Sequence, residues 1–115
     1  MRPDERRRHP RYETSGLRAR LQQIHRCEVM KLSRGGMLVV APVELQPEAV
    51  VASELYLTGV VFRARARVAF VGPDTAAPGS GRTRIGVEFI DPSDDAQRVL
   101  DQFIADRFVG QPASP

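Results

Sequence analysis

The sequence predicts a mainly β domain, in which six short antiparallel strands form a small barrel or sandwich and one amphipathic helix follows them. Apolar and polar residues alternate with a period of two in several segments of residues 17–90, with turn-forming residues between them. After Asp91 the apolar residues recur with the period of a helix. The length, 115 residues, is that of one domain. Short strands at regular spacing are typical of a small barrel or sandwich.

Residues 1–16 are predicted to be an exposed basic arm. They include Pro3 and Pro10, and five arginines fall within the first eleven residues. A segment with so little apolar content cannot order itself by burial, so we expect a flexible arm that a surface or a ligand must order. Residues 17–110 then form the barrel and the helix, and residues 111–115 form a disordered tail.

The first half of the barrel begins at Leu17, where alternation of apolar and polar residues indicates a half-buried strand. A turn is expected at residues 23–26. Gly35 and Gly36 are expected to supply the positive φ angles of a tight turn between the second and third strands. The predicted strands of this half are residues 17–22, 27–32 and 37–40.

The second half contains three further strands and a longer loop. Residues 73–81 are rich in Pro, Gly, Ser and Thr and indicate that loop. In the strand before it, alternation places Phe70 on the inward face with the alanines and Val68, and places the arginines outward. The predicted strands of this half are residues 50–57, 60–72 and 83–90.

A helix of about residues 92–109 follows the last strand. Asp91 is the expected N-cap and Pro92 the first helical residue, while Gly110 and Pro112 are expected to end the helix. One apolar stripe must lie on the β-structure. This stripe consists of Ala96, Val99, Leu100, Phe103, Ile104 and Phe108.

Composition excludes several classes of protein. No apolar run approaches the roughly 20 residues of a membrane span, and the charged N-terminus lacks the apolar segment of a signal peptide. Cys27 is the only cysteine, so no internal disulfide forms, and with two histidines a zinc site is not expected. We therefore expect a cytoplasmic protein with no metal and no cofactor. No catalytic constellation is visible, which predicts that the protein is not an enzyme.

Arginine dominates the basic residues, since 16 of the 17 are arginine and only Lys31 is lysine. The guanidinium group matches phosphate and the guanine edge with a planar fork of donors. A GC-rich coding bias would produce the same excess. Residues 1–90 carry 15 basic and 9 acidic groups, a net charge of +6, so an anionic ligand is expected on that part of the chain.

Two motifs carry a resemblance to a known family. Arg7 and Arg11 form an R-x-x-x-R pair just before the first strand, and the segment from Lys31 to Gly36 reads K-L-S-R-G-G. The sequence resembles the PilZ domain, a bacterial receptor module for cyclic di-GMP. The signature of that family is R-x-x-x-R, followed roughly 20–25 residues later by [D/N]-x-S-x-x-G. Together with the strand pattern and the helix, the resemblance covers nearly the whole chain.

The resemblance implies a six-stranded barrel and an arm that folds over cyclic di-GMP as a switch. Carried over position by position, it implies that Arg7, Arg11, Ser33 and Gly36 bind the ligand. Arginines can meet phosphate oxygens and the guanine O6 and N7 atoms. Five neighbouring residues form a second set of candidate ligand contacts. These are Arg6, Arg8, Lys31, Arg34 and Gly35. In the family, a basic residue at the position of Arg6 is associated with binding a stacked pair of ligands.

Lys31 departs from the family pattern, because it occupies the position of the Asp or Asn. A carboxylate or amide oxygen accepts hydrogen bonds from guanine N1 and N2, whereas lysine has three donors and no acceptor. Loss of a bidentate contact to a base edge costs roughly 1–3 kcal/mol, by analogy with the reading of DNA. Lys31 can recover part of this by pairing with a phosphate.

Three functions follow from these observations. The first is a cyclic di-GMP receptor that signals through an unidentified protein partner. The second is a degenerate PilZ adaptor that binds no nucleotide and acts through protein contacts. The third, a small basic barrel that binds nucleic acid, is disfavoured because most of the seven aromatic residues fall on predicted core faces, which leaves few for base stacking.

Overall fold

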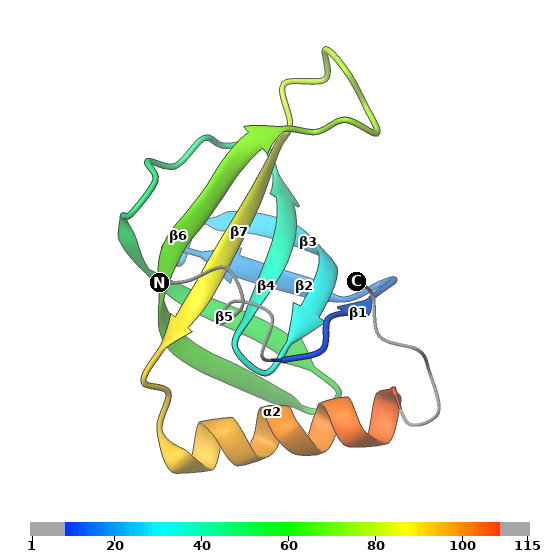
Figure 1. The fold of residues 1–115 in the computed structure, drawn as a ribbon, viewed down its shortest axis with the longest axis vertical. Coiled ribbons are helices and arrows are strands. Elements are labelled where there is room, and N and C mark those ends of the chain that lie inside the picture. Colours follow the sequence, from blue (N-terminus) through cyan, green and yellow to red (C-terminus); the bar gives the residue numbers. More distant parts are fainter. Residues whose placement is uncertain (1–8, 109–115) are drawn as a thin grey trace.

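The computed structural model describes residues 9–108, and Figure 1 shows their arrangement. The predictions for residues 1–8 of the arm and for the tail at residues 111–115 lie outside this part of the chain. The strands are β1 (Tyr12–Glu13), β2 (Arg18–Leu21), β3 (His25–Ser33), β4 (Gly36–Ala41), β5 (Val50–Leu57), β6 (Val60–Pro73) and β7 (Thr83–Ile90), and the helix is α2 (Asp94–Arg107).

The six longer strands close into an antiparallel barrel. β2 pairs with β3, β3 with β4, β4 with β7, β7 with β6, β6 with β5, and β5 with β2 again. Alternate residues of each strand point inward, and the largest fully buried side chains include Leu21, Leu32, Leu55, Phe62 and Ile85. The predicted fold class, a six-stranded barrel with a C-terminal helix, is confirmed.

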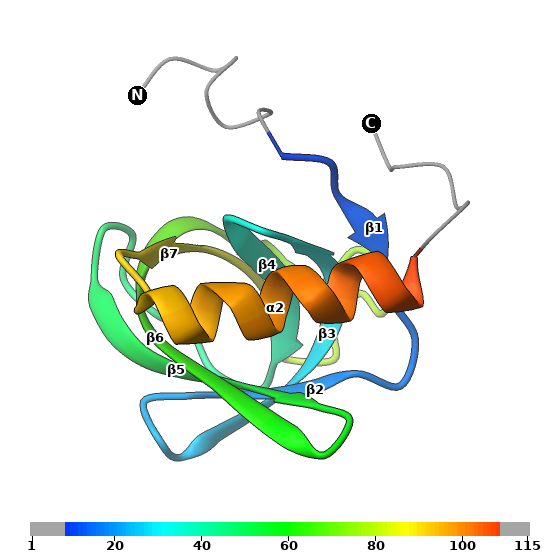
Figure 2. The same ribbon diagram turned by 90° about the horizontal axis from the view of Figure 1, so that it is seen from below.

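Helix α2 lies across one end of the barrel (Figure 2). Leu100, Ile104 and Phe108 of the predicted apolar stripe are buried in the core, which confirms the amphipathic pattern. The predicted N-cap at Asp91 is wrong, since Ser93 caps the helix with its Oγ accepting from the Ala96 amide at 3.1 Å. Asp91 instead has a φ of 40° in the turn from β7, so the helix begins later than predicted.

The end of the N-terminal arm is part of the fold. Tyr12 and Glu13 pair with Leu32 and Lys31 of β3, and the Tyr12 ring stacks on Phe108 at a centroid distance of 4.9 Å. The prediction that the arm is unordered up to residue 16 is therefore wrong for these residues. Backbone pairing and ring stacking hold them, and neither produces an apolar pattern in the sequence.

Two β-bulges interrupt the alternation of the strands. On β3, Met30 is an extra residue between Val29 and Lys31, and on β6, Ala69 is an extra residue between Val68 and Phe70. A bulge shifts the following side chains to the other face of the sheet. Phe70 is therefore 52% exposed on the outer face, and the prediction that it points inward is wrong.

The turn between β2 and β3 is shorter than predicted. Gln22 and Gln23 adopt positive φ angles of 55° and 65°, and β3 begins at His25 instead of Cys27. Gln22, Gln23 and Ile24 are all exposed, so burial leaves no pattern in the sequence that would mark the turn. The tight turn allows His25 and Arg26 to pair with Leu21 and Arg20.

Cys27 is 4% exposed, and burial raises the pKa of its thiol to about 11, so it stays protonated at neutral pH. Within residues 9–108, no helix has the length and apolar character needed to span a membrane. The same residues contain no group of three His, Cys, Asp or Glu side chains that could hold a metal ion.

Candidate functional site

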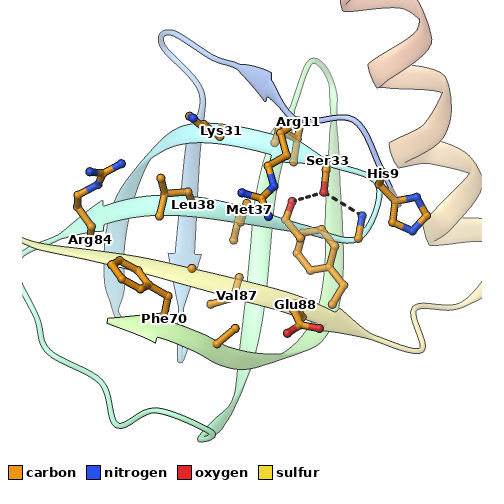
Figure 3. Close-up of a pocket in the computed structure, with 16 residues that line it drawn as sticks. His9, Arg11, Lys31, Ser33, Met37, Leu38, Phe70, Arg84, Val87 and Glu88 are labelled. Carbon is orange, nitrogen blue, oxygen red and sulfur yellow. Dashed lines mark hydrogen bonds between the residues drawn. The ribbon is translucent and has the colours of Figure 1, made fainter. Parts of the chain in front are cut away.

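A pocket of about 630 Å³ lies on the outer face of β3, β4, β7 and β6 (Figure 3). The chain folds five of the predicted ligand residues into its lining, although they come from separate parts of the sequence. These residues are Arg11, Lys31, Ser33, Gly35 and Gly36. The two motifs that the sequence places about 20 residues apart therefore meet at one site.

The bulge at Met30 gives β3 its role in the pocket. It places Leu32 in the core and turns Lys31 and Ser33 to the outer face. With unbroken alternation from Val29, Leu32 would face solvent. Burial of Leu32, which is fully enclosed, therefore fixes the direction of both pocket residues.

The Ser33 hydroxyl organises the turn that follows it. Its Oγ donates to the Gly36 carbonyl at 3.4 Å and accepts from the Gly35 amide at 3.2 Å, and Figure 3 shows both bonds. A hydroxyl has one donor and two acceptor sites. One acceptor site of Ser33 therefore stays available for an N–H group of a ligand, such as that of a guanine edge.

The two glycines serve close approach instead of positive φ, which corrects the sequence prediction. Neither is among the residues with positive φ. A Cβ on Gly36 would collide with the backbone carbonyl of Val87, and one on Gly35 would lie 2.9 Å from the His9 ring. The absence of these two side chains lets β4 lie close to β7 and lets His9 lie against the turn.

The pocket has a basic lining. Arg11, Lys31 and Arg84 contribute positive charges, and Glu88 is the one carboxylate among the described residues that line it. Arg67 Nη2 donates to Glu88 Oε2 at 3.2 Å and offsets that negative charge. The arrangement favours an anion, because three positive groups and one carboxylate line a partly enclosed cavity.

Phe70 and Arg84 form the end of the pocket opposite His9 (Figure 3). The Phe70 ring packs against Gly72, where a Cβ would lie 2.9 Å from the ring, and the Phe70 Cβ lies over Gly86, where a Cβ would lie 3.3 Å from it. Sequence reasoning missed Phe70, because a bulge leaves no mark in the alternation. Arg84 could have been found, because it alternates with the inward-facing Ile85.

Four candidate ligand residues are not among the described residues that line the pocket. Arg34 turns away from it and pairs with Asp101 of α2. The other three, Arg6, Arg7 and Arg8, lie outside the described residues. Of the R-x-x-x-R pair, Arg11 is within the described residues and lines the pocket, and Figure 3 shows its side chain extending over the sheet.

Comparisons with known proteins agree with this architecture. The chain is similar to the motility inhibitor MotI/DgrA of Bacillus subtilis (TM-score 0.72, 19% identity), covering 87% of this chain and 50% of that one. It is also similar to the PilZ domain of Escherichia coli YcgR with c-di-GMP (TM-score 0.72, 22% identity), covering 88% and 90%. A longer structure of Escherichia coli YcgR in complex with c-di-GMP is similar with a TM-score of 0.69 and 20% identity. The match covers 89% of this chain and 46% of that one.

The chain thus spans about half the length of MotI and of the longer YcgR structure. No curated protein matches it in a sequence comparison. A family model described as the PilZ domain matches residues 5–106, which include both motifs, all seven strands and nearly all of α2. This chain therefore belongs to the PilZ domain family.

Proposed function

We propose that this protein is a cytoplasmic receptor for cyclic di-GMP that acts by binding and catalyses no reaction. The observation that carries the proposal is the convergence of Arg11, Ser33 and Gly36 in one basic pocket. Two of the structural neighbours, both of YcgR, are described with c-di-GMP. A cyclic dinucleotide has two phosphates and two guanines, which match a pocket with arginines, a hydroxyl and an exposed aromatic ring.

Each pocket residue has a role that its chemistry supports. Arg11, together with Arg7, clamps phosphate oxygens and the guanine edge through charge-assisted hydrogen bonds. Ser33 accepts a hydrogen bond from a guanine N–H group, and Gly36 lets the ligand approach the backbone. Phe70 offers its ring to a base. Binding by Arg7 and Arg11 would order the arm, and a protein partner would read that change.

Calorimetric titration of the purified protein with cyclic di-GMP tests the proposal. Cyclic di-AMP and GTP are the controls, because they share the phosphates but not the pair of guanines in a ring. Selective heat with a definite stoichiometry is expected, and a ratio of two ligands per protein would indicate a stacked pair. Absence of heat at high micromolar ligand would contradict the receptor function.

Lys31→Asp is expected to strengthen binding about tenfold to hundredfold, because Asp restores an acceptor for guanine N1 and N2 that is worth roughly 1–3 kcal/mol. The Lys31 side chain lines the pocket, so the new carboxylate would face the ligand. Calorimetry on both proteins measures the change. Weaker binding by the variant would show that Lys31 itself holds a phosphate.

Phe70→Leu is expected to weaken binding of cyclic di-GMP about tenfold, since stacking of a base on an aromatic ring contributes roughly 1–3 kcal/mol. Leucine keeps an apolar cover over Gly72 and Gly86 but removes the π face. The matched control is Val60→Ala, at an exposed aliphatic residue that does not line the pocket. Equal affinities of the wild type and Phe70→Leu for cyclic di-GMP would contradict the stacking of a base on Phe70.

The adaptor that binds no nucleotide is the second candidate, and Lys31 is the observation that favours it. In that case the protein would act only through contacts with a partner protein. The Lys31→Asp variant separates the two candidates. An adaptor with an otherwise intact pocket would gain binding from this one substitution, while the receptor binds before it.

A further inference from the structure

An ion pair with two parallel hydrogen bonds attaches the turn between β3 and β4 to the C-terminal helix. Arg34 Nε lies 2.8 Å from Asp101 Oδ1, and Arg34 Nη2 lies 2.9 Å from Oδ2 of the same carboxylate. This paired geometry uses the planar guanidinium group and fixes orientation as well as distance. The contact joins the second sequence motif to a helix residue 67 positions later.

Gln97 makes a second attachment one turn earlier on α2. Its Nε2 donates to Asp101 Oδ1 at 2.8 Å and to the Arg34 backbone carbonyl at 3.3 Å. The helix therefore binds both the side chain and the main chain of Arg34. Arg34 and Gln97 both donate to the Asp101 carboxylate, and together they hold it in the orientation that pairs with the guanidinium group.

Asp101 is charged at neutral pH. Burial raises the pKa of this carboxyl, but hydrogen bonds from Arg34 and Gln97 and the positive charge of Arg34 outweigh burial and lower the pKa below its usual value. A lowered carboxyl pKa means that the ion pair is complete above the ordinary Asp range. It is lost as the pH falls through the lowered value.

The attached turn forms one end of the candidate ligand site. Ser33, Gly35 and Gly36 line the pocket, whereas Arg34 between them points toward α2. The Gly35 carbonyl also accepts from the Phe89 amide at 2.8 Å. The backbone of β7 and the side chains of α2 thus hold the turn from two sides.

We propose that Asp101 and Gln97 are positioning residues of the ligand site, which act through Arg34 so that α2 sets ligand affinity without touching the ligand. The inference rests on the proposed function. A turn that is held in its binding geometry loses less conformational freedom on binding. By thermodynamic linkage, bound ligand must strengthen the contact between turn and helix by the same factor.

Calorimetry with cyclic di-GMP on Arg34→Gln, Asp101→Asn and the double variant tests the inference. Each single variant is expected to bind about twofold to fivefold more weakly, which is the order expected of a well-formed exposed ion pair. The double variant should bind no more weakly than either single variant, because both remove the same contact. Arg34→Lys keeps the positive charge but loses the paired hydrogen bonds of the guanidinium group. Its affinity for cyclic di-GMP should therefore lie between those of the wild type and Arg34→Gln.

Asp95→Asn is the matched control. Asp95 is on the same helix and pairs with Arg98 at 3.0 Å, but its side chain is 90% exposed and does not contact the turn. This variant should bind like the wild type. Hydrogen exchange of the Phe89 amide, which reports on the Gly35 carbonyl, should become faster in Asp101→Asn and stay unchanged in Asp95→Asn.

Two results would overturn the inference while the proposed function stands. If Asp101→Asn binds like the wild type, the ion pair is only structural. If Arg34→Gln binds more weakly than the wild type while Asp101→Asn binds as tightly as the wild type or more tightly, Arg34 contacts the ligand itself. Failure of the wild-type protein to bind would contradict the proposed function and the inference together.

Discussion

Gly36→Ala is expected to lower the free energy of unfolding by about 3 kcal/mol, at the upper end of the usual cost of overpacking. The new Cβ would collide with the backbone carbonyl of Val87. No rotamer change relieves this contact, because the obstacle is the main chain of the neighbouring strand. β4 and β7 would have to separate at Gly36, where Ser33 and the turn also lie.

Urea denaturation and thermal melting measure this effect, and a Tm lower by about 10 °C is expected for a domain of this size. Gly35→Ala is the matched control in the same turn. Its Cβ would meet the His9 ring, which is a side chain that can move. We expect a loss of less than about 1 kcal/mol there. Equal stability of the two variants would contradict the close approach of β4 and β7.

Arg11→Ala is expected to abolish measurable binding of cyclic di-GMP while the circular dichroism spectrum is unchanged. Each hydrogen bond to a charged group contributes about 1.5–3 kcal/mol, and the guanidinium group can make two of them to one phosphate. Arg11 lines the pocket and precedes β1, so its removal leaves the pairing of Tyr12 with Leu32 intact. Calorimetry measures the loss of affinity.

Arg65→Ala controls for the loss of one positive charge. Arg65 is exposed on the outer face of β6 and does not line the pocket, so binding should change little. The same large loss is expected for Arg7→Ala, although Arg7 lies outside the described residues. Unchanged binding in both Arg7→Ala and Arg11→Ala would remove the R-x-x-x-R pair from the site and contradict the receptor assignment.

The barrel could be predicted from the sequence because burial of one face imposes a period of two on most strands. Leu17, Ala19 and Leu21 are buried as the alternation indicates, and Leu100 and Ile104 are buried as the helical period indicates. These patterns reflect transfer of apolar side chains from water, which is the dominant favourable contribution to folding. The strand order is a different matter, because the barrel closes through the non-consecutive pairs β2–β5 and β4–β7, which no local pattern indicates.

The remaining features could not be predicted, because they depend on backbone contacts between distant segments. The bulge beside Phe70 changes the register against β7, and no local pattern marks it. Strand β1 is two residues long and is held by Leu32 and Phe108, both remote in sequence. Ser33 and Gly36 were found because a motif names them, whereas the link from Arg34 to Asp101 requires knowledge of the helix position.

The stack of Tyr12 on Phe108 has a consequence for how such a domain can be combined with others. It places β1 beside the C-terminal end of α2, so the first strand and the last helix of the domain meet at one corner of the barrel (Figure 2). A domain whose two junctions lie side by side can be inserted into a surface loop of a host protein without stretching the host. The ring stack also connects this corner to the candidate site, because Tyr12 directly follows Arg11 of the pocket lining.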